Sequence, residues 1–187
     1  MTDAPAEYAD KLPANHHSGL PLALWVVKAR GNLYVKGPKG SGKTHLAASL
    51  AGILGLPWGF SQLTDGASYT WLTGSQTIAG YVTRPFVECF THGGVFLGDE
   101  IDGADANMLL VLNAALANGE WSNPVTGEIL TKHPDFVFVA AANTWGLGAD
   151  GSYRGRNALD GATLDRFAPW RVEIGYDNAL ESKLFHG

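Results

Sequence analysis

The chain has 187 residues, of which 45% are hydrophobic, and a formal net charge of −5 at neutral pH, which suits one globular domain with a sizeable core. The acidic balance argues against tight, non-specific binding to duplex DNA as the main activity, although a local basic patch could still act. The single cysteine, Cys89, excludes an internal disulfide and any site with several cysteine ligands.

Residues 1–19 precede the first expected element of the fold. They are polar and contain Pro5 and Pro13, so we interpret them as a linker or an arm laid over the domain, with His16 and His17 in solvent. They lack a signal-peptide pattern, and no apolar run of the chain is long enough to cross a bilayer. Together with the single cysteine, these features favour a cytoplasmic protein without a membrane partner.

Order is expected to begin near residue 20. The apolar stretch 20–30 predicts a short helix, and the glycine-bounded sequence GNLYVKG at 31–37 predicts a strand. The glycine-rich loop GPKGSGKT comes next, and the Ala- and Leu-rich stretch 45–55 predicts a helix that ends at a glycine. The sequence PWGFSQ at 57–62 predicts a second strand. The domain therefore begins as strand, glycine loop and helix.

The glycine loop from Gly37 to Thr44 satisfies the pattern G-x-x-x-x-G-K-[ST] between a predicted strand and a predicted helix, the context that a phosphate-binding loop requires. Its glycines allow tight turns that direct backbone N–H groups at phosphate oxygens, near the positive end of a helix. Lys43 is expected to reach the β- and γ-phosphates, and Thr44 to place its hydroxyl on Mg²⁺. The residues expected to bind nucleotide are Gly37, Pro38, Lys39, Gly40, Ser41, Gly42, Lys43, Thr44 and His45.

The middle of the chain predicts two more helices and another strand. Residues 63–83 are rich in Gly, Ser and Thr and are interpreted as a long loop or small hairpin. Pro85 fits the first turn of a helix that runs to about residue 92, and GVFLGDE at 94–100 predicts a short buried strand that ends in acids. A strongly apolar helix follows over 105–119, with an aspartate as its N-cap and a glycine as its stop.

The last third of the chain continues the alternation. Two short extended pieces around a Thr-Gly turn predict a hairpin over 120–132, and the apolar run 135–143 predicts another buried strand. Little regular structure is expected over 144–161, before a short helix at 162–167 and a final strand at 169–174. Strands that alternate with helices and are apolar along their length predict a parallel sheet covered on both faces.

Polar side chains end two of these predicted strands. Asp99 and Glu100 are adjacent carboxylates, and the C-terminal edge of an open α/β sheet is where nucleotides bind. We assign Asp99 to the Mg²⁺ shell and Glu100 to the attacking water. Asp102 is interpreted as a solvated acid or one that leads the next helix. The amide of Asn143 could hold the same water or a γ-phosphate oxygen, and a turn asparagine is the alternative.

The motifs GPKGSGKT, GVFLGDEID, FVFVAAANT and GATLDRF occur in the order of the Walker A, Walker B, sensor 1 and arginine-finger elements of an AAA+ ATPase core, which the chain resembles over about residues 20–178. Within that superfamily it is most similar to the branch that holds the MoxR-type ATPases, midasin and the ATPase subunit of cobaltochelatase. The resemblance implies a P-loop NTPase three-layer sandwich, with a parallel five-stranded sheet in the order 5-1-4-3-2. It also implies self-association into a ring, usually of six.

By the same resemblance, Asn143 is sensor 1 and Arg166 is the finger that reaches the neighbouring subunit's site. Such a finger neutralises charge that develops on the γ-phosphate. A surface arginine paired to Asp165 or Glu173 is the alternative for Arg166. Three other arginines compete for the role of finger: Arg154, Arg156 and Arg171.

The chain departs from the AAA+ pattern at its C-terminal end. AAA+ proteins normally continue into a small helical lid, which carries the sensor 2 residue and closes over the nucleotide. This sequence ends where a lid would start, so we expect the lid to be absent and residues 179–187 to be the start of a missing or truncated one. Truncation of a longer protein is the favoured interpretation. Nucleotide affinity, ring assembly and turnover are then expected to be weaker than in complete family members.

The leading functional hypothesis is an ATPase that hydrolyses Mg-ATP at a site shared between subunits to remodel an unknown protein client or protein–nucleic acid partner. A nucleotide-switched ring-assembly or DNA-associated module with little turnover is the second hypothesis, and a motor that uses GTP is the third. Tyr69 and Trp71 lie where AAA+ rings present loops to their pore, so they could grip a peptide or stack on single-stranded nucleic acid. Packing within a small hairpin is the alternative for both aromatics.

Overall fold

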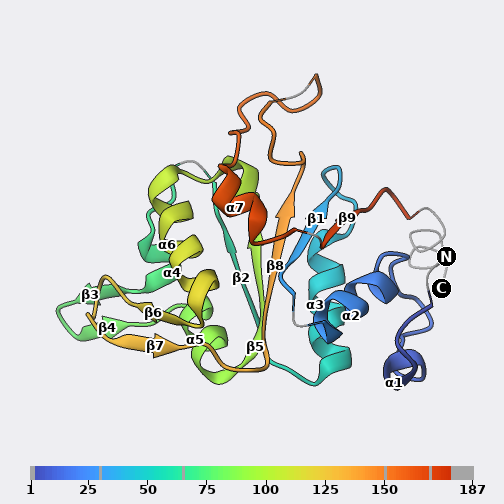
Figure 1. The fold of residues 1–187 in the computed structure, drawn as a ribbon, viewed down its shortest axis with the longest axis horizontal. Coiled ribbons are helices and arrows are strands. Elements are labelled where there is room, and N and C mark those ends of the chain that lie inside the picture. Colours follow the sequence, from blue (N-terminus) through green and yellow to red (C-terminus); the bar gives the residue numbers. More distant parts are fainter. Residues whose placement is uncertain (1–2, 30, 65, 150, 169, 178–187) are drawn as a thin grey trace.

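Five strands form the central sheet: β1 (Leu33–Lys36), β2 (Trp58–Gln62), β5 (Gly94–Asp99), β8 (Phe136–Ala142) and β9 (Arg171–Glu173). In the computed structural model, which describes residues 3–29, 31–64, 66–149, 151–168 and 170–177, their order is β2-β5-β8-β1-β9 and every neighbouring pair is parallel (Figure 1). Counted along the chain, this is the order 5-1-4-3-2 that the resemblance implied, so the expected fold is confirmed. The expected lid start at 179–187 lies outside the described residues.

Helices cover both faces of the sheet (Figure 1). On one face lie α2 (Leu20–Lys28) and α3 (Lys43–Leu54), and on the other lie α5 (Pro85–His92) and α6 (Ala106–Asn118). The shorter elements are α1 (Ala6–Ala9), α4 (Thr70–Thr73), the 3-10 turn η1 (Ile101–Gly103) and α7 (Gly161–Asp165). No helix in the described part of the chain is long and apolar enough to span a bilayer.

Strand β5 shows why its sequence is apolar at every position. Successive side chains of a strand point to opposite faces. Val95 and Leu97 therefore pack against α2 and α3, whereas Phe96 packs among the aromatic side chains on the α5 and α6 side. All three are fully buried. A strand buried on both faces needs no polar alternation, so its continuous apolar run follows from its central place in the sheet.

The ends of the two long helices follow local signals in the sequence. The Asp105 side chain accepts a hydrogen bond from the Met108 N–H (2.8 Å) and caps α6. Gly119 ends α6 and Gly55 ends α3, each in the left-handed conformation that glycine adopts without steric cost. The predicted cap and stops are therefore found at the positions expected.

The N-terminal segment packs onto the domain. Ala4, Tyr8 and Leu12 contact the apolar cluster beneath α2 and α3. His16 is half-buried, and His17 is only 2% exposed, with its Nδ1 accepting a hydrogen bond from the backbone N–H of Gly19 (3.0 Å). The expectation of a solvated His17 is therefore wrong, because the following turn folds the ring back against the phosphate loop.

Two hairpins project from the side of the molecule that carries α5 and α6 (Figure 1). They are β3 (Ser75–Thr77) with β4 (Gly80–Val82), and β6 (Glu120–Ser122) with β7 (Ile129–Thr131). The first lies in the segment expected to be a loop or hairpin, and the second in the predicted hairpin segment. Tyr69 and Trp71 belong to the turn and helix before β3 and are 39% and 47% exposed, so they are not packed within the hairpin.

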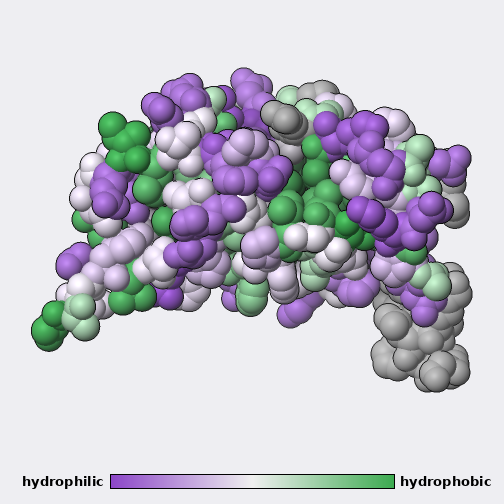
Figure 2. Space-filling view, turned by 90° about the horizontal axis from the view of Figure 1, so that it is seen from below, coloured by the Kyte–Doolittle hydropathy of each residue, from purple (hydrophilic) through white to green (hydrophobic). Residues whose placement is uncertain are grey.

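The end of the sheet opposite the phosphate loop has a hollow of about 550 Å³. Val27, Leu54 and Leu56 line it, together with charged side chains that include Lys28 and Lys132. Figure 2 views the molecule from this end and shows apolar side chains gathered near the middle of the face. The hollow is thus separated from the polar strand ends, which lie at the other edge of the sheet.

Candidate functional site

The loop from Gly37 to Gly42 joins β1 to α3 at the C-terminal edge of the sheet. Gly40 and Gly42 both have a φ of 83°, in the left-handed region that a residue with a Cβ rarely adopts. The loop leads into the first turn of α3, whose free N–H groups and dipole favour an anion. The hydroxyl of Ser41 is buried within the loop and has no hydrogen-bond partner among the described residues. These donors and the unused hydroxyl fit a phosphate group.

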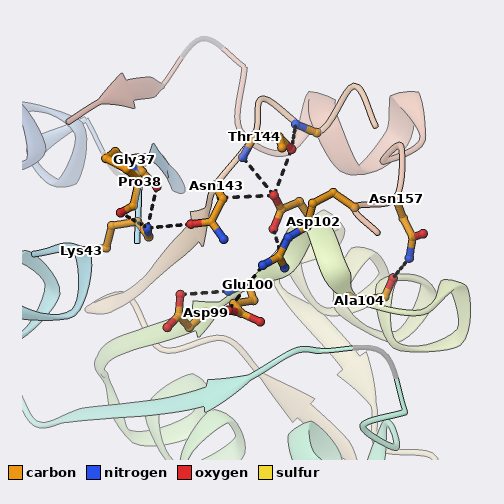
Figure 3. A network of polar contacts seen from close by, with 12 residues as sticks. Gly37, Pro38, Lys43, Asp99, Glu100, Asp102, Ala104, Asn143, Thr144 and Asn157 are labelled. Carbon is orange, nitrogen blue, oxygen red and sulfur yellow. Dashed lines mark hydrogen bonds and ion pairs between the residues drawn. The ribbon is translucent and has the colours of Figure 1, made fainter. Parts of the chain in front are cut away.

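The ammonium group of Lys43 is held by oxygens of its own chain. Its Nζ donates hydrogen bonds to the carbonyl oxygens of Gly37 (2.7 Å) and Pro38 (3.0 Å) and to Oδ1 of Asn143 (3.1 Å) (Figure 3). Burial lowers the pKa of Lys43, and the nearby carboxylates oppose this effect. Because its hydrogen-bond acceptors are neutral, the cation can exchange them for the charged oxygens of a phosphate.

Two acids follow each other at the end of β5. Glu100 has a φ of 57° and is the only non-glycine residue with a positive φ in the described ranges. A backbone in this region costs about 1–3 kcal/mol and persists where the surroundings impose it. Oδ1 of Asp99 accepts a hydrogen bond from the Glu100 N–H (2.9 Å), which fixes the two residues relative to each other. Burial raises the pKa of Asp99, although this hydrogen bond and Lys43 act in the opposite direction.

The strand order explains why these groups meet. Strand β8 lies between β5 and β1, so Asn143, which follows β8, stands between the acids and the phosphate loop. The N–H of Gly37 donates to the carbonyl of Ala142 (3.0 Å) and holds the start of the loop beside the end of β8. Asn143 is 6% exposed, and its amide oxygen faces Lys43.

Asp102 is the centre of the polar network in Figure 3. It is fully buried, so its interpretation as a solvated acid is wrong. Its Oδ2 accepts hydrogen bonds from the backbone N–H groups of Asn143 (3.1 Å) and Thr144 (2.9 Å) and from the Thr144 hydroxyl (3.0 Å). A buried carboxylate is tolerated where donors of this kind replace water. Asp102 therefore fastens the segment after Glu100 to the end of β8.

Arg156 completes this network from the long segment between β8 and α7. Its Nη1 lies 3.4 Å from Oδ1 of Asp102, and its Nη2 lies 3.5 Å from Oε1 of Glu100. The side chain of Arg156 is 16% exposed. The structure thus places Arg156, one of the arginines that compete for the role of finger, in contact with acids of its own chain.

Arg166 ends α7 and is partly buried. Its Nε is buried and has no hydrogen-bond partner within the described ranges. The ion pair with Glu173 is not found, because Glu173 pairs with Lys36 (Nζ to Oε1, 2.6 Å). Arg154 and Arg171 are exposed. The contacts within one chain do not distinguish Arg166, Arg154 and Arg171, so the assignment of Arg166 as the arginine finger stays a prediction.

The structure therefore brings Lys43, Asp99, Glu100 and Asn143 to one edge of the sheet, as predicted from the phosphate loop and from the polar residues at the strand ends. Sequence reasoning did not foresee the roles of Asp102 and Arg156 in this network. For Asp102 the available signal was its place directly beyond a buried strand, where the end of a neighbouring strand offers backbone donors. For Arg156, in a segment without regular pattern, the sequence carried no such signal.

The donor set at this edge suits Mg²⁺. Within the described residues, no group of three or more His, Cys, Asp or Glu side chains could hold a metal ion. The expected ligands, the exposed hydroxyl of Thr44 and the carboxylate of Asp99, are both oxygen donors. Mg²⁺ prefers oxygen and is commonly held by one or two protein ligands, with substrate phosphates and water at the remaining positions. The residues present therefore fit a metal that binds together with a nucleotide.

Comparisons with known proteins find similarity over the same region. The profile of the AAA domain of the dynein-related subfamily matches residues 32–167. An uncharacterised protein of Staphylococcus epidermidis is 31% identical over 155 residues, covering 78% of this chain and 56% of that protein. A solved structure from Cytophaga hutchinsonii, provisionally described as an ATPase, has a TM-score of 0.65 at 19% identity, over 86% of this chain and 46% of that one. Brucella abortus NtrX, solved with ADP, has a TM-score of 0.61 at 12% identity, over 94% of this chain and 37% of that one.

These similarities differ in what they establish. The chain spans about half the length of the curated relatives that it matches. The solved structures are under 25% identical and therefore show the fold alone. The finer likeness to the branch that holds the MoxR-type ATPases remains a prediction.

Proposed function

The chain belongs to the AAA domain family, in its dynein-related subfamily, and on that basis we propose that it binds and hydrolyses Mg-ATP at a site shared between subunits. Hydrolysis drives the remodelling of a protein or protein–nucleic acid partner. In this proposal the protein assembles into a ring of six subunits and acts in the cytoplasm.

One observation supports this proposal most strongly. Nζ of Lys43, in the phosphate loop, and Oδ1 of Asn143, at the end of β8, lie 3.1 Å apart, although 100 residues separate them in the sequence. Asp99 and Glu100 end the adjacent strand β5. A phosphate-binding cation, two carboxylates and an amide at one sheet edge are the groups that phosphoryl transfer to water requires.

In the proposed reaction each group has one role. Lys43 binds the β- and γ-phosphates in place of its present backbone acceptors, and Thr44 and Asp99 hold Mg²⁺, which neutralises phosphate charge when bound. Glu100 accepts a proton from the attacking water, and Asn143 orients that water or a γ-phosphate oxygen. A neighbour's Arg166 stabilises charge that develops on the γ-phosphate.

The decisive experiment measures ATP turnover per chain as a function of protein concentration across the micromolar range. We expect the specific activity to rise with concentration, because a neighbouring chain completes the site. Glu100→Gln should reduce turnover by about 10²- to 10⁴-fold, the contribution of a general base. Glu88→Gln, at an exposed position on α5, is the matched control and should be unchanged.

Other outcomes would replace the proposal. ATP-dependent assembly with negligible turnover at every concentration would favour the nucleotide-switched module. Turnover of GTP but not of ATP in the same assay would favour the GTP-using motor. Binding of neither nucleotide would exclude all three functions.

A further inference from the structure

Arg156 joins two carboxylates of its own chain, and one of them is the proposed base. The guanidinium lies 3.4 Å from Asp102 and 3.5 Å from Glu100. Its side chain is 16% exposed, the Asp102 side chain is fully buried and the Glu100 side chain is 32% exposed. Arginine suits this position because its planar fork can bind two carboxylates at once, whereas lysine presents one point charge.

The segment around Arg156 is fastened to the turn that carries these acids. The N–H of Asn157 donates to the carbonyl of Asp102 (2.7 Å), and Nδ2 of Asn157 donates to the carbonyl of Ala104 (3.2 Å). The guanidinium lies over Gly103, where a Cβ would come within 2.9 Å of Nη1 of Arg156. The position of Arg156 is therefore set by backbone contacts on both sides of Gly103.

The backbone of Glu100 is also fixed, by its hydrogen bond to Asp99 and its left-handed conformation. Only the rotamer of the Glu100 side chain remains to be selected. The ion pair with Arg156 selects that rotamer, because the buried Asp102 holds the guanidinium of Arg156 in place. The same acid, Asp102, accepts a hydrogen bond from the backbone N–H of Asn143. The ion-paired Asp102 and Arg156 therefore hold both Glu100 and Asn143.

We propose that Arg156 is a positioning residue for hydrolysis. It acts within its own chain by holding the carboxylate of Glu100 in a fixed position relative to the amide of Asn143. This inference rests on the proposed function, because it assigns hydrolysis to Glu100. It also removes Arg156 from the arginines that could act in a neighbouring site. Withdrawal of the guanidinium would leave a buried carboxylate without its cation, which folded proteins avoid.

Two variants test this role by different routes. Arg156→Gln removes the charge, whereas Gly103→Ala retains every functional group and displaces the guanidinium. A misplacement of about 1 Å at a catalytic group can cost about 100-fold in rate. We therefore expect kcat to fall by about 10- to 100-fold in both variants, with the ATP dissociation constant changed by less than about twofold.

The controls separate positioning from general stability. Gly151→Ala makes the same chemical change in the same long segment, at a glycine whose added Cβ would meet no atom within 4 Å, and should leave kcat unchanged. Arg156→Lys should recover part of kcat, because it restores one charge without the fork. Thermal melting of each variant, and ATP binding by calorimetry, show whether the fold and the phosphate loop are intact.

Each outcome decides the inference. A fall in kcat at constant ATP affinity, shared by Arg156→Gln and Gly103→Ala and partly recovered in Arg156→Lys, would support it. Wild-type kcat in folded Arg156→Gln would overturn the positioning role and leave the proposed function standing. A wild-type chain that binds ATP but shows no turnover at any concentration would overturn both. Loss of ATP affinity in parallel with kcat would assign Arg156 to nucleotide binding and overturn the inference.

Discussion

Lys43 is held by three oxygens that belong to its own chain. A bound phosphate would offer it charged acceptors in their place, and a hydrogen bond to a charged group contributes about 1.5–3 kcal/mol. Lys43→Ala should therefore weaken ATP binding by about 100-fold or more, measured by calorimetry. Lys132→Ala, at the opposite end of the sheet, should leave the affinity unchanged. Equal affinities for wild type and Lys43→Ala would contradict the phosphate-loop assignment.

The raised pKa of Asp99 predicts how the stability of the fold depends on pH. Burial raises its pKa in the folded chain above the ordinary value of 3.8, so the folded state binds this proton more tightly than the unfolded state does. Its contribution to stability is greatest below the ordinary pKa and is lost as the pH rises through the folded pKa. Ionised Asp99 is therefore unfavourable at neutral pH, a cost that its proposed role in binding Mg²⁺ would explain.

We expect Asp99→Asn to raise the melting temperature at neutral pH, by about 2–4 °C for each kcal/mol recovered. The amide oxygen of Asn can still accept the Glu100 hydrogen bond, so the change removes the charge alone. The gain should shrink as the pH falls and Asp99 of the wild type becomes protonated. Melting curves from about pH 3 to about pH 8 test this, and a lower melting temperature for Asp99→Asn at neutral pH would contradict it.

At the scale of elements, the site depends on the order of the strands. Because β8 is inserted between β5 and β1, a polar residue just after β8 lies beside both the phosphate loop and the acids. The parallel register pairs Lys36 of β1 with Ala142 of β8 and Gly98 of β5 with Ala140. The polar groups therefore follow strands that end at nearly the same level. A different strand order would leave the same motifs far apart.

Helix α6 begins shortly after the acids, and its N-cap is testable. Asp105→Ala removes the acceptor for the Met108 N–H, and loss of such a cap costs about 1 kcal/mol. For a chain of this size, the melting temperature should fall by about 2–4 °C. Asp105→Asn keeps an oxygen in place and should remain close to the wild type. A melting temperature for Asp105→Ala equal to that of Asp105→Asn would show that the cap does not stabilise α6.

At the scale of the whole molecule, the proposal divides each active site between two chains. Lys43, Asp99, Glu100 and Asn143 meet within one chain, whereas Arg166 has no hydrogen bond or ion pair to any of them in the described structure. In the proposal, each chain binds ATP with its own groups, and a neighbouring chain supplies the arginine that hydrolysis needs.

Mixing two inactive variants tests this arrangement. Arg166→Ala alone should bind ATP with the wild-type affinity and lose turnover by about 10³- to 10⁵-fold, the range for other arginine fingers. When it is mixed with Lys43→Ala, activity should return, because the Lys43→Ala chain still carries Arg166. Lys43→Ala mixed with Glu100→Gln should stay inactive, since neither chain then provides a complete set of its own groups. No recovery in the first mixture would place the finger elsewhere.

The sequence by itself determined the elements of this protein and most of its candidate site. Caps, glycine stops, buried strands and the phosphate loop are local patterns, because they depend on neighbours a few residues away. The place of Lys43 at the end of the phosphate loop, and of Asp99, Glu100 and Asn143 at or just after strand ends, was therefore readable before the fold was known.

Only the tertiary structure decided how those groups are supported. Asp102 is buried because the ends of β5 and β8 lie side by side and offer it backbone donors. Arg156 reaches Glu100 because a segment without regular structure folds back over η1. His17 is buried because its turn packs against the phosphate loop. Each of these contacts joins residues or strands that are distant in the sequence or lie in irregular segments, where no periodicity predicts the partner.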